Sequence, residues 1–428
     1  MSAADFTDEE LAAIRADFPI LTRVGRGGGR IAYFDSSATS QKPAVVIDSV
    51  DEFYRQHNGA VHRGTHVLGD ESTSLYEDAR HVLADFIGGR DDEIVWTKNA
   101  TEGINVVAYS MSNASAGRGG QEAQRLLAVG PGDRIVSTRA EHHANLVPWQ
   151  ELCQRSGAEF KWLDLTPDGR IDLDTLDVIT PNTKLVAVTH VSNVTGAITP
   201  LEPILAAARN VGALILLDTC QSSAHFPINV KDLGVDFCVF SGHKMMGPTG
   251  VGALWAKRSI LESMPPVLMG GSMIADVTME STTYMDPPER FEAGSQPVAQ
   301  IAGWAVALRY LKKLGMDRVA AHEATITEAL LEGIRSVPGV TILGPTDCSD
   351  RIGVVSWSVD GVHPHDVGQV MDADDVAVRV GHHCALPLHY FFGQRASTRA
   401  SSAVTNTVEE VELLVRSLEK VRGYFGKK

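Results

Sequence analysis

The chain has 428 residues, 44% of them hydrophobic, which is enough to bury a large core and to divide into two or more domains. Its 38 Lys and Arg residues against 53 Asp and Glu residues give a formal net charge of −15 at pH 7. This acidic balance argues against a nucleic-acid binder and against a protein held on a membrane of anionic lipid, because both need a basic face.

The first residues of the chain do not resemble a targeting signal. Residues 1–21 are acidic and amphipathic, without the basic start and apolar run of a secretory signal. The longest apolar runs, such as residues 211–217, are too short to span a bilayer. Five cysteines without a C-x-x-C pair argue against a disulfide framework and against a metal site built from thiolates. We therefore expect a soluble, cytoplasmic protein with free thiols and no metal.

Short apolar segments alternate with amphipathic helical patterns through the first two thirds of the chain. Segments that are apolar on both faces and separated by helices predict an α/β fold with a mostly parallel sheet flanked by helices. We assign residues 31–305 to this large domain. The expected strands include residues 93–97, 134–138, 185–190, 213–218, 237–241 and 252–256, and two of the expected helices are residues 101–110 and 203–210.

The pattern changes after about residue 301. Long helices are expected at residues 301–314 and 320–337, short strands at 340–343 and 352–357, and a final helix at 407–425. These elements predict a smaller α+β domain made of residues 306–428. Residues 1–30, which end in a Gly-rich turn, are expected to pack against it as an N-terminal arm. Residues 113–124 are small, polar and Gly-rich, which predicts a surface loop without an assigned role.

Polar groups follow several of the expected strands, where a parallel sheet forms its ligand site. Lys244 follows one buried strand, and removal from water favours an amine that forms imines. Asp218 ends another strand and could pair with a protonated pyridine nitrogen. His142 could stack on such a ring, and Thr101, at a helix start, could help to hold a phosphate. Each of these residues alone is more often a surface group or a helix cap, so the prediction rests on the four together.

Five segments carry a resemblance to a known family. They are SGHKMMGPTGVGALW, LLDTCQSSAH, THVSNVTGAI, AEHHANLVPWQEL and DSSATSQKP. They closely resemble the class V aminotransferase family of fold-type I pyridoxal-phosphate (PLP) transferases. Within that family, the chain is similar to group II cysteine desulfurases of the SufS type, over residues 33–424.

The resemblance implies PLP as the cofactor and a role for each matching position. Lys244 would hold PLP through an imine and act in catalysis, Asp218 would pair with the pyridine nitrogen, and His142 would stack on the ring and take part in catalysis. The other implied cofactor ligands are Gln221 for the phenolic oxygen, Thr101, Ser241 and His243 for the phosphate, and Ser295 from a partner subunit. Ser295 lies in FEAGSQ, where threonine is more usual, and Asn99-Ala100-Thr101 replaces a more usual Gly-Thr-Thr.

The segment RVGHHCALPL surrounds Cys384 with groups that favour a thiolate. Arg379, His382 and His383 are the neighbours expected to do this, whereas most free cysteines are buried and inert. A metal site at His382, His383 and Cys384 is disfavoured, because adjacent residues rarely point at one ion. The resemblance implies that Cys384 receives sulfur as a persulfide. It also implies a set of substrate-binding residues: Asn193, Arg379 and Arg399, with His62 and Arg63 reaching into a partner's site.

The function implied by the resemblance is PLP-dependent conversion of L-cysteine to L-alanine, with the sulfur feeding iron–sulfur cluster assembly. Only fifteen positions separate Cys384 from Arg399 (399 − 384), and this short loop favours group II. A homodimer and a sulfur acceptor of the SufE or SufU type are implied as well. His365 matches a histidine that can take part in zinc exchange with SufU-type acceptors. The alternatives are a selenocysteine lyase, another class V PLP enzyme, or a non-catalytic iron–sulfur assembly scaffold.

Overall fold

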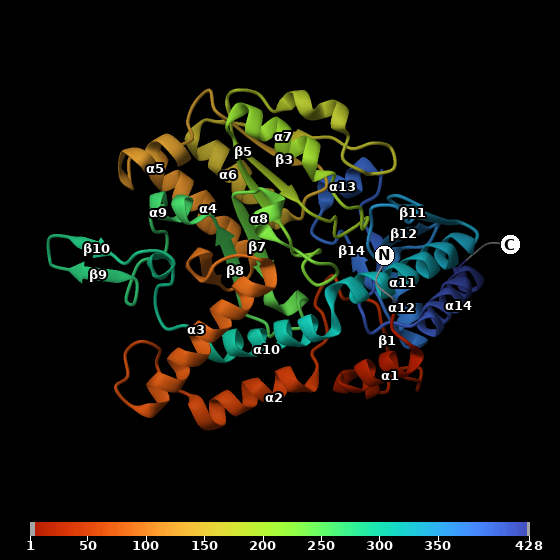
Figure 1. The fold of residues 1–428 in the computed structure, drawn as a ribbon. Coiled ribbons are helices and arrows are strands. Elements are labelled where there is room, and N and C mark those ends of the chain that lie inside the picture. Colours follow the sequence, from red (N-terminus) through yellow and green to blue (C-terminus); the bar gives the residue numbers. More distant parts are fainter. Residues whose placement is uncertain (1–4, 426–428) are drawn as a thin grey trace.

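A seven-stranded sheet forms the centre of the computed structural model, which describes residues 5–425 (Figure 1). Its strand order is β2-β8-β7-β6-β5-β3-β4. β8 is antiparallel to both of its neighbours, and the remaining neighbours pair in parallel, which confirms the mostly parallel sheet. The bounds are β2 Ile94–Thr97, β3 Arg134–Thr138, β4 Glu159–Leu163, β5 Thr183–Thr189, β6 Leu214–Asp218, β7 Phe237–Ser241 and β8 Gly252–Ala256.

Both faces of this sheet are covered, which explains why its strands are apolar without alternation. In β6, Leu214 and Leu216 belong to one hydrophobic cluster, while Ile215 and Leu217 belong to another. Successive side chains of a strand point to opposite faces, so each face has its own core. Helices α4 (Ala100–Ser115), α5 (Gly120–Leu127), α6 (Val147–Ser156) and α9 (Arg258–Ser263) contribute to one cluster. Helices α2 (Ala44–Glu52), α3 (Val67–Ile87), α7 (Leu201–Val211), α8 (Val230–Leu233) and α10 (Val298–Leu314) contribute to the other.

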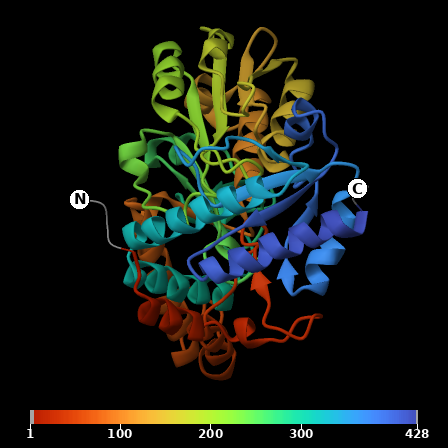
Figure 2. The ribbon, with the colours of Figure 1, turned by 90° about the vertical axis from the view of Figure 1, so that its right-hand side faces the viewer.

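A second, antiparallel sheet of order β11-β12-β15-β14 lies in the C-terminal part of the chain. Its strands are β11 (Val340–Leu343), β12 (Val354–Val359), β14 (Arg379–Gly381) and β15 (Ser397–Ser401). It packs with α11 (Met316–Ser336), α12 (Pro364–Ala373) and α14 (Val408–Phe425), and Figure 2 shows α11 and α14 side by side. The predicted domain boundary at residues 305–306 falls within α10, and the division into domains stays a prediction. Within residues 5–425, no helix has the length and apolar character needed to cross a membrane.

The N-terminal arm packs against α11 and α14. Helix α1 (Asp8–Ala16) begins with a capping box. The Thr7 side chain accepts a hydrogen bond from the Glu10 backbone N–H, and the Glu10 side chain accepts one from the Thr7 backbone N–H. Ion pairs join its Arg15 to Glu410 at 2.7 Å and its Glu10 to Arg318 at 2.6 Å. The Gly-rich turn that follows is held by the Asp375 carboxylate, which accepts backbone hydrogen bonds at 2.6 Å from residues 27 and 29.

Two local predictions differ from the structure. Residues 113–124 are largely helical, because α4 continues to Ser115 and α5 begins at Gly120. The small residues Ala114 and Ala123 are fully buried in the core. Small side chains allow helices to pack closely, and a helix rich in them has the same composition as a loop. Strands β14 and β15 were not predicted, since they are short and carry polar residues. Two further strands, β9 (Ile274–Val277) and β10 (Thr282–Tyr284), form a hairpin that projects from the molecule (Figure 1), and β1 (Ala32–Tyr33) pairs with β13 (Val376–Ala377).

A buried ion pair fixes the segment that contains Ser295. The Glu292 carboxylate accepts hydrogen bonds from both terminal nitrogens of Arg80, at 2.8 and 2.9 Å, and from Tyr76 Oη at 2.6 Å. It also accepts from the Trp96 backbone N–H at 2.8 Å. The Arg80 and Glu292 side chains are 3% and 4% exposed. Water therefore cannot readily replace either residue as the partner of the other's charge.

Replacing Glu292 with alanine should lower the free energy of unfolding by about 3–5 kcal/mol, because the buried guanidinium of Arg80 loses its buried carboxylate partner. Chemical unfolding followed by circular dichroism measures the change. Glu77→Ala is the matched control, since Glu77 also contacts Arg80 (3.2 Å) but is 43% exposed and should cost less than about 1 kcal/mol. Equal losses in the two variants would contradict the assignment of stability to the buried pair.

Candidate active site

One cavity of about 190 Å³ lies at the carboxyl ends of the central strands, next to the second sheet. Most of the residues singled out in the sequence line it, although they come from widely separated segments. The eleven are Thr101, His142, Asn193, Asp218, Gln221, Ser241, His243, Lys244, Arg379, Cys384 and Arg399. The fold therefore brings together a lysine, a carboxylate, two arginines and a thiol, while the role of each residue stays a prediction.

Adjacent parallel strands place Asp218 and Lys244 in this cavity. β6 ends at Asp218, and β7 ends at Ser241, three residues before Lys244. The Asp218 carboxylate accepts a hydrogen bond from the Cys220 backbone N–H at 2.9 Å, and Asp218 forms part of the cavity wall. Lys244 is half-buried, and the structure records no hydrogen bond or ion pair for its amine within residues 5–425. A lysine with this freedom can react with a ligand carbonyl.

The start of α4 forms an anion-binding corner of the cavity. Asn99 caps the helix by accepting a hydrogen bond from the Glu102 backbone N–H at 3.0 Å, and Ser241 Oγ accepts one from Ala100 at 3.0 Å. Thr101 is exposed on the first turn. A Cβ at Gly252 would lie 2.6 Å from Asn99 Cα, so glycine is needed for β8 to approach this turn. The positive end of the helix dipole makes such a corner suitable for a phosphate.

His142 lines the cavity as a neutral ring. Burial, followed by the positive charge of Lys244, lowers the pKa of His142 to about 3. A neutral imidazole can stack on an aromatic ligand. The residue before it, Glu141, is buried and accepts hydrogen bonds from Thr138 Oγ1 (2.8 Å), Asn145 Nδ2 (2.7 Å) and the backbone N–H of Thr189 (2.7 Å). Burial raises the pKa of Glu141 to about 8, and the three hydrogen bonds to its carboxyl group anchor the loop behind the cavity.

Two arginines enter the cavity from the edge of the second sheet. β14 and β15 are paired so that Arg379 and Arg399 lie opposite each other. Arg399 is 2% exposed and donates to the Asn193 carbonyl at 2.9 Å and to Asp35 Oδ1 at 3.0 Å. Burial lowers the pKa of Arg399 to about 10, which leaves the guanidinium charged at neutral pH. These two cations on one strand pair suit a carboxylate ligand.

Unpaired polar atoms in the cavity wall test whether a polar cofactor fits. Arg399 Nε, Asn193 Oδ1 and Gln221 Oε1 are buried and lack a hydrogen-bond partner within the described residues. Buried polar atoms normally have a partner, and unpaired ones cost about 1–3 kcal/mol each. A ligand that carries a carboxylate, a phosphate and an aromatic ring with polar substituents would satisfy these atoms, the anion corner, Asp218 and Lys244 together. The residues present therefore fit PLP with an amino acid.

Cys384 lies on a strained loop between β14 and α13 (Leu386–Phe391). His383 and Cys384 have φ angles of +50° and +56°, a backbone conformation that residues other than glycine rarely adopt. Three hydrogen bonds hold the loop in this shape. Asn193 Nδ2 donates to the His383 carbonyl at 2.7 Å, the His143 backbone N–H donates to the Cys384 carbonyl at 2.7 Å, and the Cys384 N–H donates to His382 Nδ1 at 3.0 Å. The strain is thus maintained by contacts from the large sheet's loops.

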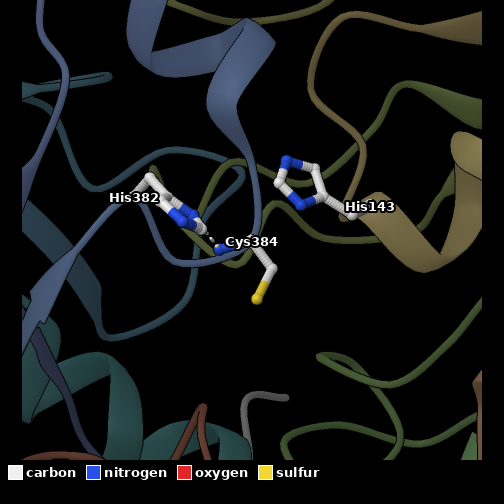
Figure 3. Close-up of side chains that lie close together, drawn as sticks. All are labelled: His143, His382 and Cys384. Carbon is white, nitrogen blue, oxygen red and sulfur yellow. Dashed lines mark hydrogen bonds between the residues drawn. The ribbon is translucent and has the colours of Figure 1, made fainter.

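The neighbours of the Cys384 sulfur differ from those expected. A ring nitrogen of His382 and one of His143 lie together with Cys384 Sγ, all within 4.8 Å of one another (Figure 3). His383 is not in this group: its Nε2 instead shares the Ser397 hydroxyl with His389, at 2.9 Å each. The expectation that His383 adjoins the thiol is corrected, because the left-handed backbone at residues 383 and 384 directs the two side chains apart.

The predicted residues His62, Arg63, Ser295 and His365 do not line the first cavity. His62 and Arg63 line another cavity of about 410 Å³, with Glu292 and Gln296, next to Ser295. These are the residues that the resemblance assigned to a partner's site. His365 is exposed near the start of α12.

Sequence reasoning assigned no role to three residues that build the site. They are Asp35, which pairs with Arg399, Glu141, which anchors the His142 loop, and His143, which contacts the Cys384 loop. The segments DSSATSQKP and AEHHANLVPWQEL contain them, so the signal was present. However, the site residue that each of them contacts becomes clear only when the fold brings the distant segments together.

Comparisons with known proteins agree with this geometry. The aminotransferase class-V family model matches residues 32–414. A protein of Mycobacterium leprae (strain TN) named probable cysteine desulfurase 2 is 53% identical over 422 residues, which cover 98% of this chain and 99% of that protein. A probable cysteine desulfurase of Streptomyces coelicolor is 47% identical over 416 residues and 97% of each chain.

Solved structures show the same fold over the full chain. The apo cysteine desulfurase of Thermococcus onnurineus NA1 superimposes with a TM-score of 0.89 at 37% identity, covering 99% of this chain and 100% of that one. The Escherichia coli cysteine desulfurase CsdA, in an S-sulfonic acid form, has a TM-score of 0.87 at 33% identity, again covering 99% and 100%.

Proposed function

Since this chain belongs to the class-V aminotransferase family, we propose that it is a PLP-dependent cysteine desulfurase that converts L-cysteine to L-alanine and accepts the sulfur on Cys384. The observation that carries the proposal is the shared cavity. Lys244 and Asp218 from one sheet and Arg399 and Cys384 from the other segment line the same 190 Å³ space. An aminotransferase would need the first three residues but has no use for a thiol.

The chain's own residues divide the cofactor's functional groups between them. When bound, PLP supplies a ring that withdraws electrons from the substrate's α-carbon. Asp218 would keep the pyridine nitrogen protonated, and the α4 corner with Thr101, Ser241 and His243 would hold the phosphate. Gln221, which lines the cavity, would hydrogen-bond the phenolic oxygen through its amide group.

Arg399 and Arg379 would bind the substrate carboxylate and so fix the direction of the α-proton. The unpaired Nε of Arg399 is one donor free for this contact, while its terminal nitrogens already donate to Asp35 and to the Asn193 carbonyl. Lys244 Nζ has no recorded protein partner within residues 5–425 and would remove the proton from the substrate Cα.

Sulfur transfer needs a nucleophile on the substrate's β-carbon side, and Cys384, which lines the cavity, would supply it. Its thiolate would attack the sulfur of the bound cysteine. A new S–S bond forms, the substrate's Cβ–S bond breaks, and the electron pair of that bond goes to the substrate carbon skeleton, which becomes alanine after taking up a proton. The product on the protein is a persulfide at Cys384.

Several finer features belong to the same proposal. A homodimer would bring His62, Arg63 and Ser295 of one subunit to the cavity of the other, and the separate cavity that His62 and Arg63 line in this chain supports that arrangement. A SufS-type enzyme would pass the persulfide to an acceptor of the SufE or SufU type for iron–sulfur cluster assembly. Cys384 lines a second, neighbouring cavity of about 400 Å³, which gives an acceptor a route to the sulfur.

The test is incubation of the PLP-loaded protein with L-cysteine. We expect alanine and one persulfide per chain, with further alanine once an acceptor or a reductant removes the sulfur. A parallel incubation with selenocysteine compares the two substrates. Absence of both alanine and persulfide, with PLP bound, would refute the proposed function and favour a scaffold.

A further inference from the structure

The group formed by Cys384, His143 and His382 combines two loops that are far apart in sequence. His143 follows β3, and His382 follows β14. Figure 3 shows the two imidazoles beside the Cys384 side chain, one from each loop. One ring nitrogen of each imidazole and Cys384 Sγ are all within 4.8 Å of one another. The proposed mechanism makes no use of His143.

Backbone hydrogen bonds fix which nitrogen of each ring carries a hydrogen. The Leu386 N–H donates to His143 Nε2 at 3.0 Å, and the Cys384 N–H donates to His382 Nδ1 at 3.0 Å. A neutral imidazole has one lone pair and one N–H. Each accepting nitrogen uses its lone pair, so the hydrogens are on His143 Nδ1 and His382 Nε2. Burial lowers the pKa of His143, which also favours its neutral form.

This arrangement of hydrogens decides what the group can bind. A metal ion such as Zn²⁺ binds imidazole through a lone pair and thiolate through its charge. Both lone pairs are already engaged by backbone N–H groups of the Cys384 loop, so an ion would have to break hydrogen bonds that hold the loop. The remaining nitrogens are donors, and donors suit an anion.

We propose that His143 and His382 act as paired neutral N–H donors to the sulfur of Cys384, in its thiolate form and in its persulfide form. The second form rests on the proposed function; the first does not. An S–S bond is about 2.05 Å long, so the terminal sulfur of a persulfide lies only that much farther along the side chain. Rotation of the Cys384 side chain would bring either sulfur toward the two donors. Hydrogen bonds to charged groups are about twice as strong as neutral ones.

Two substitutions remove the donors and keep the backbone hydrogen bonds. In His143→Gln, the amide oxygen can take the place of Nε2 and accept from Leu386, while the Nδ1 donor is lost. In His382→Asn, the amide oxygen can take the place of Nδ1 and accept from Cys384, while the Nε2 donor is lost. His143→Asn is the converse control for His143→Gln. Its amide nitrogen keeps a donor at the Nδ1 position, but the hydrogen bond from Leu386 is lost.

The measurement is the rate at which iodoacetamide alkylates Cys384 in the PLP-loaded protein at pH 7, followed by peptide mass spectrometry. Cys348 is exposed, does not line the cavity, and serves as the reference thiol in the same sample. We expect Cys384 to react about 3- to 10-fold more slowly in His143→Gln and in His382→Asn, and more slowly still in the double variant. His143→Asn should react faster than His143→Gln, and the visible absorption of bound PLP should not change.

Three results would overturn the proposal. The first is an unchanged alkylation rate in the double variant, and the second is an equal slowing in His143→Asn and His143→Gln, which indicates a purely structural role. The third is protection of Cys384 from alkylation by one equivalent of Zn²⁺ in the wild type but not in the variants. Such protection would show that the imidazole lone pairs are free to bind a metal ion. Alkylation requires no turnover of cysteine, so these results are independent of whether the protein desulfurates it.

Discussion

Lys244→Ala is expected to lower kcat/KM for the formation of alanine from cysteine by about 10³-fold or more, because the variant loses both the amine that binds PLP and the base at the substrate Cα. The side chain lines the cavity together with Asp218 and Arg399, and no second lysine is among the lining residues. The visible absorption of PLP after removal of unbound cofactor measures the first loss, and alanine release measures the second.

Lys257→Ala is the control for Lys244. Lys257 follows the neighbouring strand β8 but forms a surface ion pair with Asp236 at 2.7 Å and does not line the cavity. It should retain both the absorption of bound PLP and the rate. A Lys244→Ala protein with the unaltered spectrum of the wild type would show that another group holds the cofactor.

The second large effect is expected at Cys384. Cys384→Ala should retain PLP and its absorption, since the three hydrogen bonds that hold the loop come from backbone groups and from other side chains. Persulfide formation should disappear, and alanine release should fall by about 10³-fold or more, because no nucleophile takes the sulfur. Mass spectrometry of the intact chain after incubation with cysteine measures the persulfide, and amino-acid analysis measures alanine.

Cys348→Ala is the matched control, because it removes an exposed thiol that lies outside the cavity. Both alanine and persulfide should be formed at the wild-type rate. If Cys384→Ala released alanine and sulfide as fast as the wild type, the sulfur would leave by direct elimination and the acceptor role of Cys384 would be wrong.

The two residues depend on the fold in different ways. Lys244 is positioned by a single turn after β7, next to the end of β6, so two adjacent strands are sufficient to define its place. Cys384 sits on a loop with two consecutive left-handed residues, which local sequence does not favour. Its conformation depends on Asn193 and His143, which belong to loops of the other sheet.

The local pattern of the sequence was sufficient for the elements that have one strong signal. Buried strands such as β6 and β7 are short apolar runs that end at a polar residue, so their ends, and with them Asp218 and Ser241, were predicted within one residue. The same reasoning failed for residues 113–124, where buried alanines in α4 and α5 have the composition of a loop. It also failed for β14 and β15, which are short, carry Arg379 and Arg399, and gain their stability from pairing with each other.

The sequence by itself determined the chemical groups of this protein: a lysine and an aspartate at adjoining strand ends, a helix start for an anion, and a thiol near two arginines. These follow from local pattern and from the family resemblance, because each is written within a few consecutive residues. Only the tertiary structure decided which groups meet. It paired Asp35 with Arg399, placed Glu141 behind His142, and exchanged His383 for His143 beside Cys384. These contacts join residues up to 364 positions apart, and their geometry depends on the packing of whole elements, which no local pattern records.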